Sequence, residues 1–379
     1  MSKALVLSYW NVNQPATGGL RRIHALLGAI GPKQVILCQP SPAHPACETV
    51  PLAADFGRRK RGINWGLFNF FWPSNALLVR RTVRERKPAL VVLTSIWAYF
   101  PIRDLRGVPV VLDAHDVLAS AIAGRFGPRH PFTRIVAAWE SRVARSVDHL
   151  FVCSGKDRER FLSRYGLAPE RVTTVPNGVE ISRYDAPAAD VSAEVRRHLG
   201  DSTALFFMGK LTYEPNARAL AFLNHVLLPE LERRAPGRFR LVVTGGSVPA
   251  RRMHPCALLA GTVSDAELAA LIRRADICLS PVFSGGGTRL KILEYMAAGR
   301  PVVSTAKGAE GIEAVPGKHL VLAEAEGFAD AVVRLAGAPS EAQAIGEAGR
   351  RLVAERYDWS AIRKGWQDVL GRWLERPAT

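Results

Sequence analysis

The stretch ICLSPVFSGGGTRLKILEYMAAGRPVVST, residues 277–305, sets out a pattern that the rest of the chain repeats. Its two apolar runs, Ile277–Ser280 and Pro301–Ser304, are short and lie next to Pro or Gly, as buried strands often do. Between them, Leu290–Ala298 carries apolar residues at helical spacing. A strand, a helix and a strand in succession predict a parallel βαβ unit.

The same alternation of apolar runs and amphipathic segments extends outward from this unit. In the second half, further strands are expected at Ala204–Met208, Arg240–Thr244 and Ala257–Ala260, and helices at Asn216–Arg234 and Asp265–Arg274. In the first half, strands are expected at Ala4–Ser8, Val35–Cys38, Leu90–Leu93, Val108–Asp113, His149–Cys153 and Val172–Val175. Helices are expected from Leu20 onward and at His130–Ser146, Ser154–Tyr165 (with Ser154 as its cap) and Tyr357–Leu374. The alternation predicts an α/β protein with two doubly wound, Rossmann-like halves.

The composition indicates an anionic partner without choosing one. The chain has 51 Lys and Arg against 34 Asp and Glu, a net charge of +17, which favours nucleic acid, an acidic membrane surface or a phosphorylated substrate. Its 5 cysteines include no C-x-x-C pair, so neither a disulfide framework nor a zinc site is expected, and a reducing compartment fits best. No apolar stretch is long enough for a membrane span, which predicts a cytoplasmic protein.

The triple glycine between strand and helix lets a ligand approach the backbone. The loop residues are Gly285, Gly286, Gly287 and Thr288. A helix start offers unpaired N–H groups, but its dipole gives only about 0.3–1 kcal/mol to an exposed anion. Arg289 and Lys291 are placed to add the cations that a diphosphate needs, and Glu294 to accept hydrogen bonds from a diol. The loop is neither a Walker loop nor a G-x-G-x-x-G motif, and a plain helix-starting turn is the alternative interpretation.

Several motifs together resemble the retaining glycosyltransferases of the family 4 type. They are VPNGV at 175–179, FMGKL at 207–211, VVTGG at 242–246, the loop and helix quoted above, RPVVST at 300–305 and GAEG at 308–311. The resemblance covers the second half well and the first half loosely. It implies a GT-B fold, in which two Rossmann-like domains face each other across a cleft. Residues 1–178 would form the acceptor-side domain, 179–355 the nucleotide-sugar domain, and 356–379 a helix packing back on the first domain; the turn at Pro176–Gly178 supports the boundary.

The resemblance also implies a donor site. Lys210, with Arg289 or Lys291, would contact the diphosphate, and Glu294 would hold the ribose. The backbone around Gly261 and Val263 would meet the base. The full set of expected donor-binding residues is Gly18, Gly19, Lys210, Gly245, Gly261, Val263, Gly285, Gly286, Gly287, Thr288, Arg289, Lys291 and Glu294.

The first half contributes two expected elements of the site. In PATGG, residues 15–19, Gly18 and Gly19 would lie beneath the donor phosphates, although a plain strand–helix turn is the alternative. In VVLDAHD, residues 110–116, His115 follows an apolar strand, where doubly wound domains place their chemistry. The resemblance makes His115 a donor-sugar contact. The expected catalytic residues are therefore His115, Lys210 and Lys291.

One departure from the family pattern concerns the donor sugar. Family members commonly carry two acids separated by seven residues; Glu294 matches the second acid, but Gly286 stands where the first is expected. The side chain that usually contacts sugar hydroxyls is thus missing. No metal-binding cluster is visible either, so cationic side chains and a helix start would stabilise the leaving nucleotide.

Residues 56–87 combine two basic clusters with intervening aromatic residues such as Trp65 and Trp72. This pattern suits the interface of an anionic bilayer, but an ordinary basic helix with buried aromatics explains it equally well. No nucleic-acid fold signature accompanies it, so no nucleic-acid partner is predicted.

We therefore expect a metal-independent, hexosyltransferase-type enzyme that needs no cofactor. Its co-substrate would be a nucleoside-diphosphate sugar, and its acceptor a saccharide or a polyprenyl-linked saccharide, with the enzyme cytoplasmic or peripheral at the inner membrane face. The alternatives are an epimerase or phosphorylase on the same fold and a non-catalytic subunit that binds nucleotide sugars.

Overall fold

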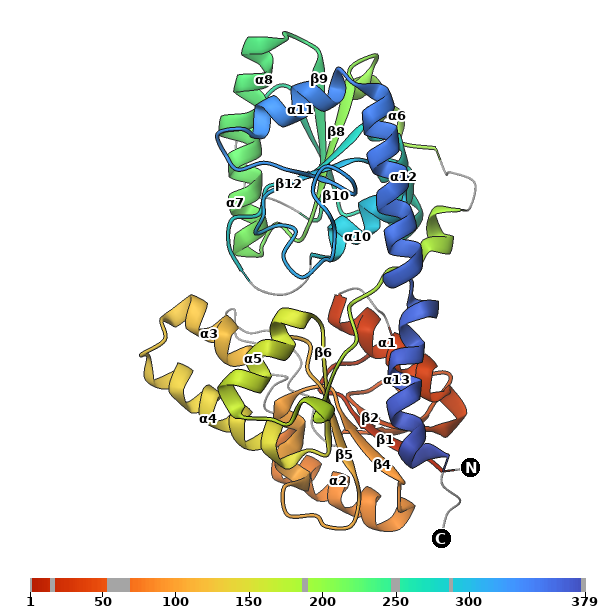
Figure 1. The fold of residues 1–379 in the computed structure, drawn as a ribbon. Coiled ribbons are helices and arrows are strands. Elements are labelled where there is room, and N and C mark those ends of the chain that lie inside the picture. Colours follow the sequence, from red (N-terminus) through yellow and green to blue (C-terminus); the bar gives the residue numbers. More distant parts are fainter. Residues whose placement is uncertain are drawn as a thin grey trace. The chain divides into compact units, whose positions relative to one another are not determined.

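The computed structural model describes residues 2–13, 18–52, 69–185, 190–246, 253–285 and 289–375. The chain divides into two compact units (Figure 1). The first unit comprises Met1–Asn177 and Ile362–Thr379, and the second comprises Gly178–Ala361. Each unit is built around one parallel β-sheet.

In the first unit, the described residues form a 7-stranded sheet in the order β3-β2-β1-β4-β5-β6-β7. Its strands are β1 (Ala4–Leu7), β2 (Val35–Gln39), β3 (Glu48–Pro51), β4 (Leu90–Leu93), β5 (Val110–Asp113), β6 (His149–Val152) and β7 (Val172–Thr174). Its helices are α1 (Gly18–Ile30), α2 (Pro73–Arg86), α3 (Leu118–Phe126), α4 (Pro131–Ser146), α5 (Gly155–Tyr165) and, from Ile362 on, α13 (Trp359–Leu374). Strands β1, β2, β4 and β6 are buried along their whole length, which is why they are apolar except at Gln39 and His149.

In the second unit, the described residues form a 6-stranded sheet in the order β10-β9-β8-β11-β12-β13. Its strands are β8 (Thr203–Met208), β9 (Phe239–Thr244), β10 (Ala257–Gly261), β11 (Ile277–Ser280), β12 (Val302–Ser304) and β13 (Val321–Leu322). Its helices are α6 (Ala193–Leu199), α7 (Glu214–Phe222), α8 (Leu228–Arg234), α9 (Asp265–Arg274), α10 (Leu290–Ala297), α11 (Phe328–Ala336) and α12 (Pro339–Arg356). Both faces of this sheet are covered: Phe206 packs into one hydrophobic cluster and its neighbour Phe207 into the other.

The two parallel Rossmann-like sheets confirm the predicted fold class, and the predicted strands lie within two residues of the observed ones. Local signals explain the helix limits. Ser154 caps α5 by accepting a hydrogen bond from the Asp157 amide, as predicted. Ser264 and Glu267 form a reciprocal capping box at the start of α9.

Two strands and several helices were not predicted. Strand β3 lies at the sheet edge and is only partly buried, so its sequence lacks a continuous apolar run. Strand β13 has only 2 residues. The helix predicted at Asn216–Arg234 begins at Glu214 and contains a π-helical turn at Leu223–Leu227 before α8. Helices α3, α6, α11 and α12 were also not predicted.

Helix α13 buries the apolar face that its sequence predicts, with Ile362, Trp366, Val369 and Leu370 all inaccessible. Among the described residues, no helix combines the length and apolarity that a membrane span requires.

Candidate functional site

In the second unit, a lysine, an asparagine and two glycines meet at the carboxyl ends of β8 and β9. Lys291 lies in the first turn of α10, and its Nζ donates a hydrogen bond to Asn216 Oδ1 of α7 at 2.9 Å. The same Nζ lies 4.1 Å from the centroid of the Phe207 ring. Lys291 is 9% exposed, so its ammonium group is held inside the protein rather than on its surface.

Glycine is required at both strand ends because the backbone passes so close to these groups. A Cβ atom on Gly209 would lie 2.7 Å from Asn216 Nδ2 and 2.9 Å from Lys291 Nζ. A Cβ atom on Gly245 would lie 1.9 Å from the carbonyl oxygen of Gly209, and Gly245 has a φ of 130°. The two turns are therefore packed backbone to backbone beside the lysine.

The charge of Lys291 is poorly compensated. Burial and, to a smaller extent, the neighbouring Arg289 guanidinium together lower its pKa to about 7. Among the described residues, no carboxylate forms an ion pair with Lys291. A buried, uncompensated cation beside an accessible glycine backbone is a place where an anionic ligand would be stabilised.

Other predicted donor residues lie around this point. Lys210 is exposed directly after Gly209, and its carbonyl accepts a hydrogen bond from Asn216 Nδ2 at 3.1 Å. Arg289 occupies the N-cap position of α10 and donates to the carbonyl of Ser284 at 2.9 Å, while Glu294 is buried one turn beyond Lys291.

The structure describes some of the remaining predicted donor-site residues and not others. The Gly261 carbonyl at the end of β10 accepts a hydrogen bond from the Gly245 amide at 2.9 Å, which joins these two turns. Val263 is only half-buried, next to the start of α9. Gly285 has a φ of 91°, which favours glycine. Gly286, Gly287 and Thr288 lie outside the described residues.

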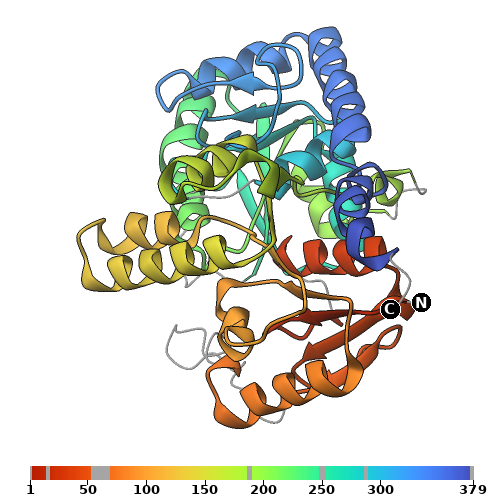
Figure 2. The same cartoon turned by 60° about the horizontal axis from the view of Figure 1, so that its bottom comes forward.

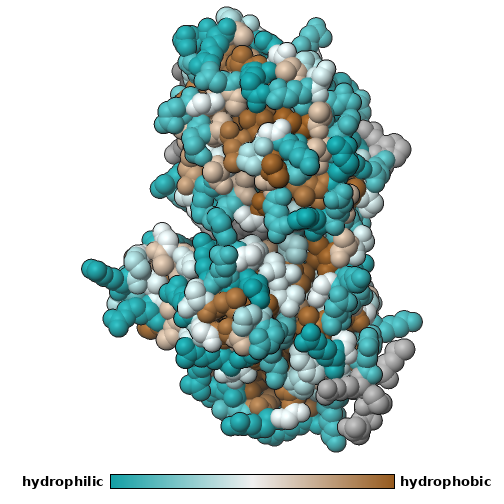
Figure 3. All heavy atoms as spheres, viewed as in Figure 1, coloured by the Kyte–Doolittle hydropathy of each residue, from teal (hydrophilic) through white to brown (hydrophobic). Residues whose placement is uncertain are grey.

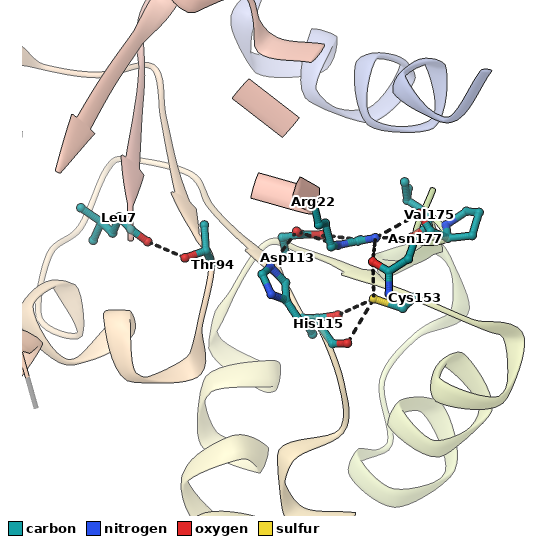
Figure 4. Close-up of polar contacts among 10 residues, drawn as sticks. Leu7, Arg22, Thr94, Asp113, His115, Cys153, Val175 and Asn177 are labelled. Atoms are coloured by element: carbon teal, nitrogen blue, oxygen red, sulfur yellow. Dashed lines mark hydrogen bonds and ion pairs between the residues drawn. The ribbon is translucent and has the colours of Figure 1, made fainter. Parts of the chain in front are cut away.

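In the first unit, His115 follows β5 and belongs to a buried polar cluster (Figure 4). Its Nε2 lies 3.4 Å from Asp113 Oδ2. Arg22 of α1 donates from Nη2 to Asp113 Oδ1 at 2.6 Å and from Nε to Asp113 Oδ2 at 2.9 Å, and both side chains are fully buried. Arg22 Nη1 also donates to the carbonyl of Val175 at 2.7 Å, and its guanidinium lies 5.0 Å from the Trp366 ring.

The ion pair sets the charge of Asp113. Burial alone would raise the pKa of this carboxyl, but the Arg22 guanidinium and, after it, the nearby His115 imidazole lower it to about 2. Asp113 therefore stays ionised at physiological pH. It can hold a proton on the imidazole nitrogen that faces it, which orients the His115 ring.

The predicted glycine loop of the first unit lies against the same histidine. A Cβ atom on Gly19, in the first turn of α1 after Gly18, would lie 3.1 Å from His115 Nδ1. The Trp10 ring stacks on His115 with centroids 6.0 Å apart. The structure thus brings Gly19 and His115 together, whereas residues 15–17 of the loop lie outside the described residues.

Four residues of these two clusters were not among the predicted site residues: Arg22, Asp113, Asn216 and Phe207. Arg22 follows Arg21 in an amphipathic helix, and nothing in its local sequence distinguishes it from a surface arginine. Asn216 was noted only as the first residue of a predicted helix, and its amide contact with Lys291 joins residues 75 positions apart. In the part of the chain that the structure describes, no group of three His, Cys, Asp or Glu residues is arranged to hold a metal ion.

Two family descriptions match the chain in succession. Residues 18–183 match "Glycosyltransferase Family 4", and residues 202–337 match "Glycosyl transferases group 1". The D-inositol 3-phosphate glycosyltransferase of Saccharomonospora viridis is 30% identical over 293 residues, covering 70% of this chain and 65% of that protein. The glycogen synthase of Mycobacterium tuberculosis is 27% identical over 268 residues, covering 67% of this chain and 61% of that protein. The chain thus spans less than two thirds of these relatives' length.

Solved structures share the fold at low sequence identity. The sucrose-phosphate synthase of Thermosynechococcus elongatus superposes with a TM-score of 0.74 at 17% identity, covering 98% of this chain and 99% of that chain. Anabaena HepE, solved in complex with UDP-glucose, superposes with a TM-score of 0.69 at 14% identity, covering 98% of this chain and 100% of that one.

Proposed function

Because the chain belongs to the family 4-like glycosyltransferases of GT-B fold, we propose that it transfers a hexose from a nucleoside-diphosphate sugar to a saccharide acceptor. The proposed reaction retains the anomeric configuration and uses no metal ion. The proposed acceptor is a saccharide or a polyprenyl-linked saccharide at the inner face of a membrane.

The observation that carries this proposal is the buried ammonium of Lys291 beside Gly209 and Gly245. A diphosphate bound there would supply the negative charge that the described surroundings of Lys291 lack. As the sugar leaves, negative charge grows on the terminal phosphate, and a preorganised cation away from bulk water stabilises that charge strongly. Arg289 and the exposed Lys210 would add to this effect. This arrangement would serve a leaving nucleotide without a metal ion.

The remaining roles extend the same proposal. Glu294 would accept hydrogen bonds from the ribose hydroxyls, and the backbone near Gly261 and Val263 would contact the base. In the first unit, His115, oriented by Asp113, would contact the donor sugar. UDP-glucose is a suitable first donor to test because it is the ligand of the HepE structure.

The test begins with donor binding. Calorimetry with UDP, GDP and their sugars should detect one preferred nucleotide, and transfer to saccharide acceptors should follow with the matching sugar. Lys291→Met should lower turnover at saturating donor by about 100-fold, the usual effect of losing one preorganised electrostatic group. The matched control is Lys318→Met, because Lys318 is an exposed lysine of the same unit.

Three outcomes would contradict the proposal. Wild-type turnover by a folded Lys291→Met variant would remove this lysine from the reaction. Nucleotide-sugar binding with no transfer to any acceptor would favour a binding subunit, and loss of activity with a chelator would contradict the metal-free reaction.

A further inference from the structure

Helices α3 and α4 of the first unit form a hairpin whose connecting turn projects away from the sheet (Figures 1 and 2). The base of the hairpin is held firmly. Glu140 of α4 accepts hydrogen bonds from the amides of Leu118 and Ala119 at the start of α3, and from the hydroxyl of Tyr165. The projecting end is therefore carried on a rigid base.

Large apolar side chains are exposed at that end. Phe126 is 45% exposed, Phe132 43% and Ile135 64%. These are three of the nine large hydrophobic side chains that are exposed in the described part of the chain, and they lie within ten residues of one another. Such clustering marks an interaction surface, whereas single exposed apolar residues do not.

The turn holds these side chains in a defined arrangement. The Phe126 and Phe132 rings meet edge to face with centroids 6.0 Å apart. Thr133 Oγ1 donates to the Gly127 carbonyl at 2.9 Å, and the Phe132 amide donates to His130 Nδ1 at 3.2 Å. Contact with a partner would therefore require little ordering of the turn.

The hairpin is also strongly basic. Residues 118–146 contain five arginines and a single acid, Glu140, which is buried at the base. Arg125, Arg129 and Arg134 are exposed beside the apolar side chains, and Arg125 lies 5.2 Å from the Phe126 ring. Figure 3 shows hydrophilic and hydrophobic side chains mixed on the projecting end. An apolar tip surrounded by cations is complementary to an anionic bilayer, whose acyl chains take the rings and whose headgroups take the arginines.

The described part of the segment whose sequence also suited an anionic bilayer, residues 56–87, differs from the hairpin in how far its charges are compensated. Residues 56–68 of the predicted range 56–87 lie outside the described residues, and α2 covers most of the rest. Three of its four arginines have acidic partners within the protein: Arg80 contacts Asp104, Arg81 contacts Glu85, and Arg86 contacts Glu48. The described part of this segment therefore offers less uncompensated charge than the hairpin.

We propose that the end of the α3–α4 hairpin, residues 125–135, docks the protein on an anionic lipid bilayer. This inference rests on the proposed function for its membrane-located acceptor, and it identifies the surface that would bring the enzyme to that acceptor.

Vesicle flotation tests the proposal directly. The full chain should bind vesicles of phosphatidylcholine with phosphatidylglycerol, bind phosphatidylcholine alone much more weakly, and dissociate as salt is added. Arg125→Ser/Arg129→Ser/Arg134→Ser should weaken binding by about fivefold for each arginine removed. Phe126→Ser/Phe132→Ser should weaken binding while leaving its salt dependence in place.

The matched control removes three exposed basic residues of α2, as Arg81→Ser/Arg84→Ser/Arg86→Ser. It should keep most of the binding. Loss of binding in this variant with retention in both hairpin variants would overturn the proposal, as would equal binding to neutral and anionic vesicles or none at low salt. Nucleotide calorimetry on the same variants separates the two proposals, because intact donor binding without membrane binding leaves the proposed function standing with a soluble acceptor.

Discussion

Two buried groups differ in whether an opposite charge lies beside them. Asp113 in the first unit has such a partner, whereas Lys291 in the second has none among the described residues. Asp113 receives hydrogen bonds from the Arg22 guanidinium, and its pKa is lowered to about 2 despite burial. Lys291 contacts the Asn216 amide oxygen and the Phe207 ring, and burial lowers its pKa to about 7.

This difference distinguishes a charged residue that supports the fold from one that is available to a ligand. A buried ion with an opposite charge beside it belongs to the framework, and removing one partner leaves the other exposed to a large desolvation cost. A buried cation whose described contacts are an amide oxygen and a ring is costly to the unliganded protein and becomes favourable when an anion binds. We therefore propose that Asp113 orients the site and that Lys291 binds the ligand.

The largest expected effect comes from breaking the ion pair. Arg22→Met leaves Asp113 buried and unpaired, which should lower the free energy of unfolding by about 3–5 kcal/mol. The corresponding change in the other unit, Lys291→Met, should leave stability unchanged or raise it at pH 8, since burying a lysine whose pKa is lowered to about 7 costs free energy that burying methionine does not. Guanidinium unfolding measures both. The double variant Arg22→Met/Asp113→Leu should recover much of the loss, and an Arg22→Met variant as stable as the parent would contradict the structural role.

The second prediction concerns the action of Asp113 through His115. His115→Ala should lower turnover by about 100-fold if the ring contacts the donor sugar. Asp113→Asn should lower turnover on its own but add little in the His115→Ala background, because its effect passes through the orientation of that ring. If the two losses multiply, Asp113 affects catalysis by another route.

The third prediction uses the lowered pKa of Lys291. A bound diphosphate raises that pKa, so nucleotide binding above pH 7 should take up as much as about one proton, and affinity should fall by up to about tenfold per pH unit from pH 7 to 9. Calorimetry in buffers of different ionisation enthalpy measures the uptake. The residual binding of Lys291→Met should lack this proton, and equal uptake in both proteins would assign it to another group.

The lowered pKa of Lys291 also determines how the stability of the protein changes with pH. The folded pKa of Lys291, about 7, lies below its ordinary value of 10.5, so between these the unfolded chain holds more protons. The contribution of Lys291 to the free energy of unfolding should therefore increase with pH from 7 to 10.5, and Lys291→Met should abolish this increase.

The smallest expected effect is at Glu294. Glu294→Ala should weaken nucleotide binding by roughly tenfold through lost hydrogen bonds to the ribose, without unfolding the protein. Glu347→Ala, which removes an exposed acid of α12, serves as the control. Unchanged affinity in a folded Glu294→Ala variant would end the ribose assignment.

Local patterns accounted for much of the fold. Buried strands such as β4 and β11 could be predicted with their limits because a strand buried on both faces must be a continuous apolar run. Helix α9 was predicted at Asp265–Arg274, where the structure has it, because its apolar residues repeat at helical spacing; in the structure a capping box stabilises its start. Strand β3 could not be predicted in this way because an edge strand needs no such run.

In the candidate site, too, some features follow from the local sequence and others only from the tertiary structure. The sequence by itself determined two Rossmann-like halves, the glycine-rich turns and the cationic side chains near them, because these depend on neighbours a few residues away. Tertiary structure alone decided which charges are compensated. Arg22 reaches Asp113 across 91 positions and Val175 across 153, while Lys291 is buried against Asn216 across 75. The state of a buried charge depends on what surrounds it in space, and those surroundings come from distant parts of the chain.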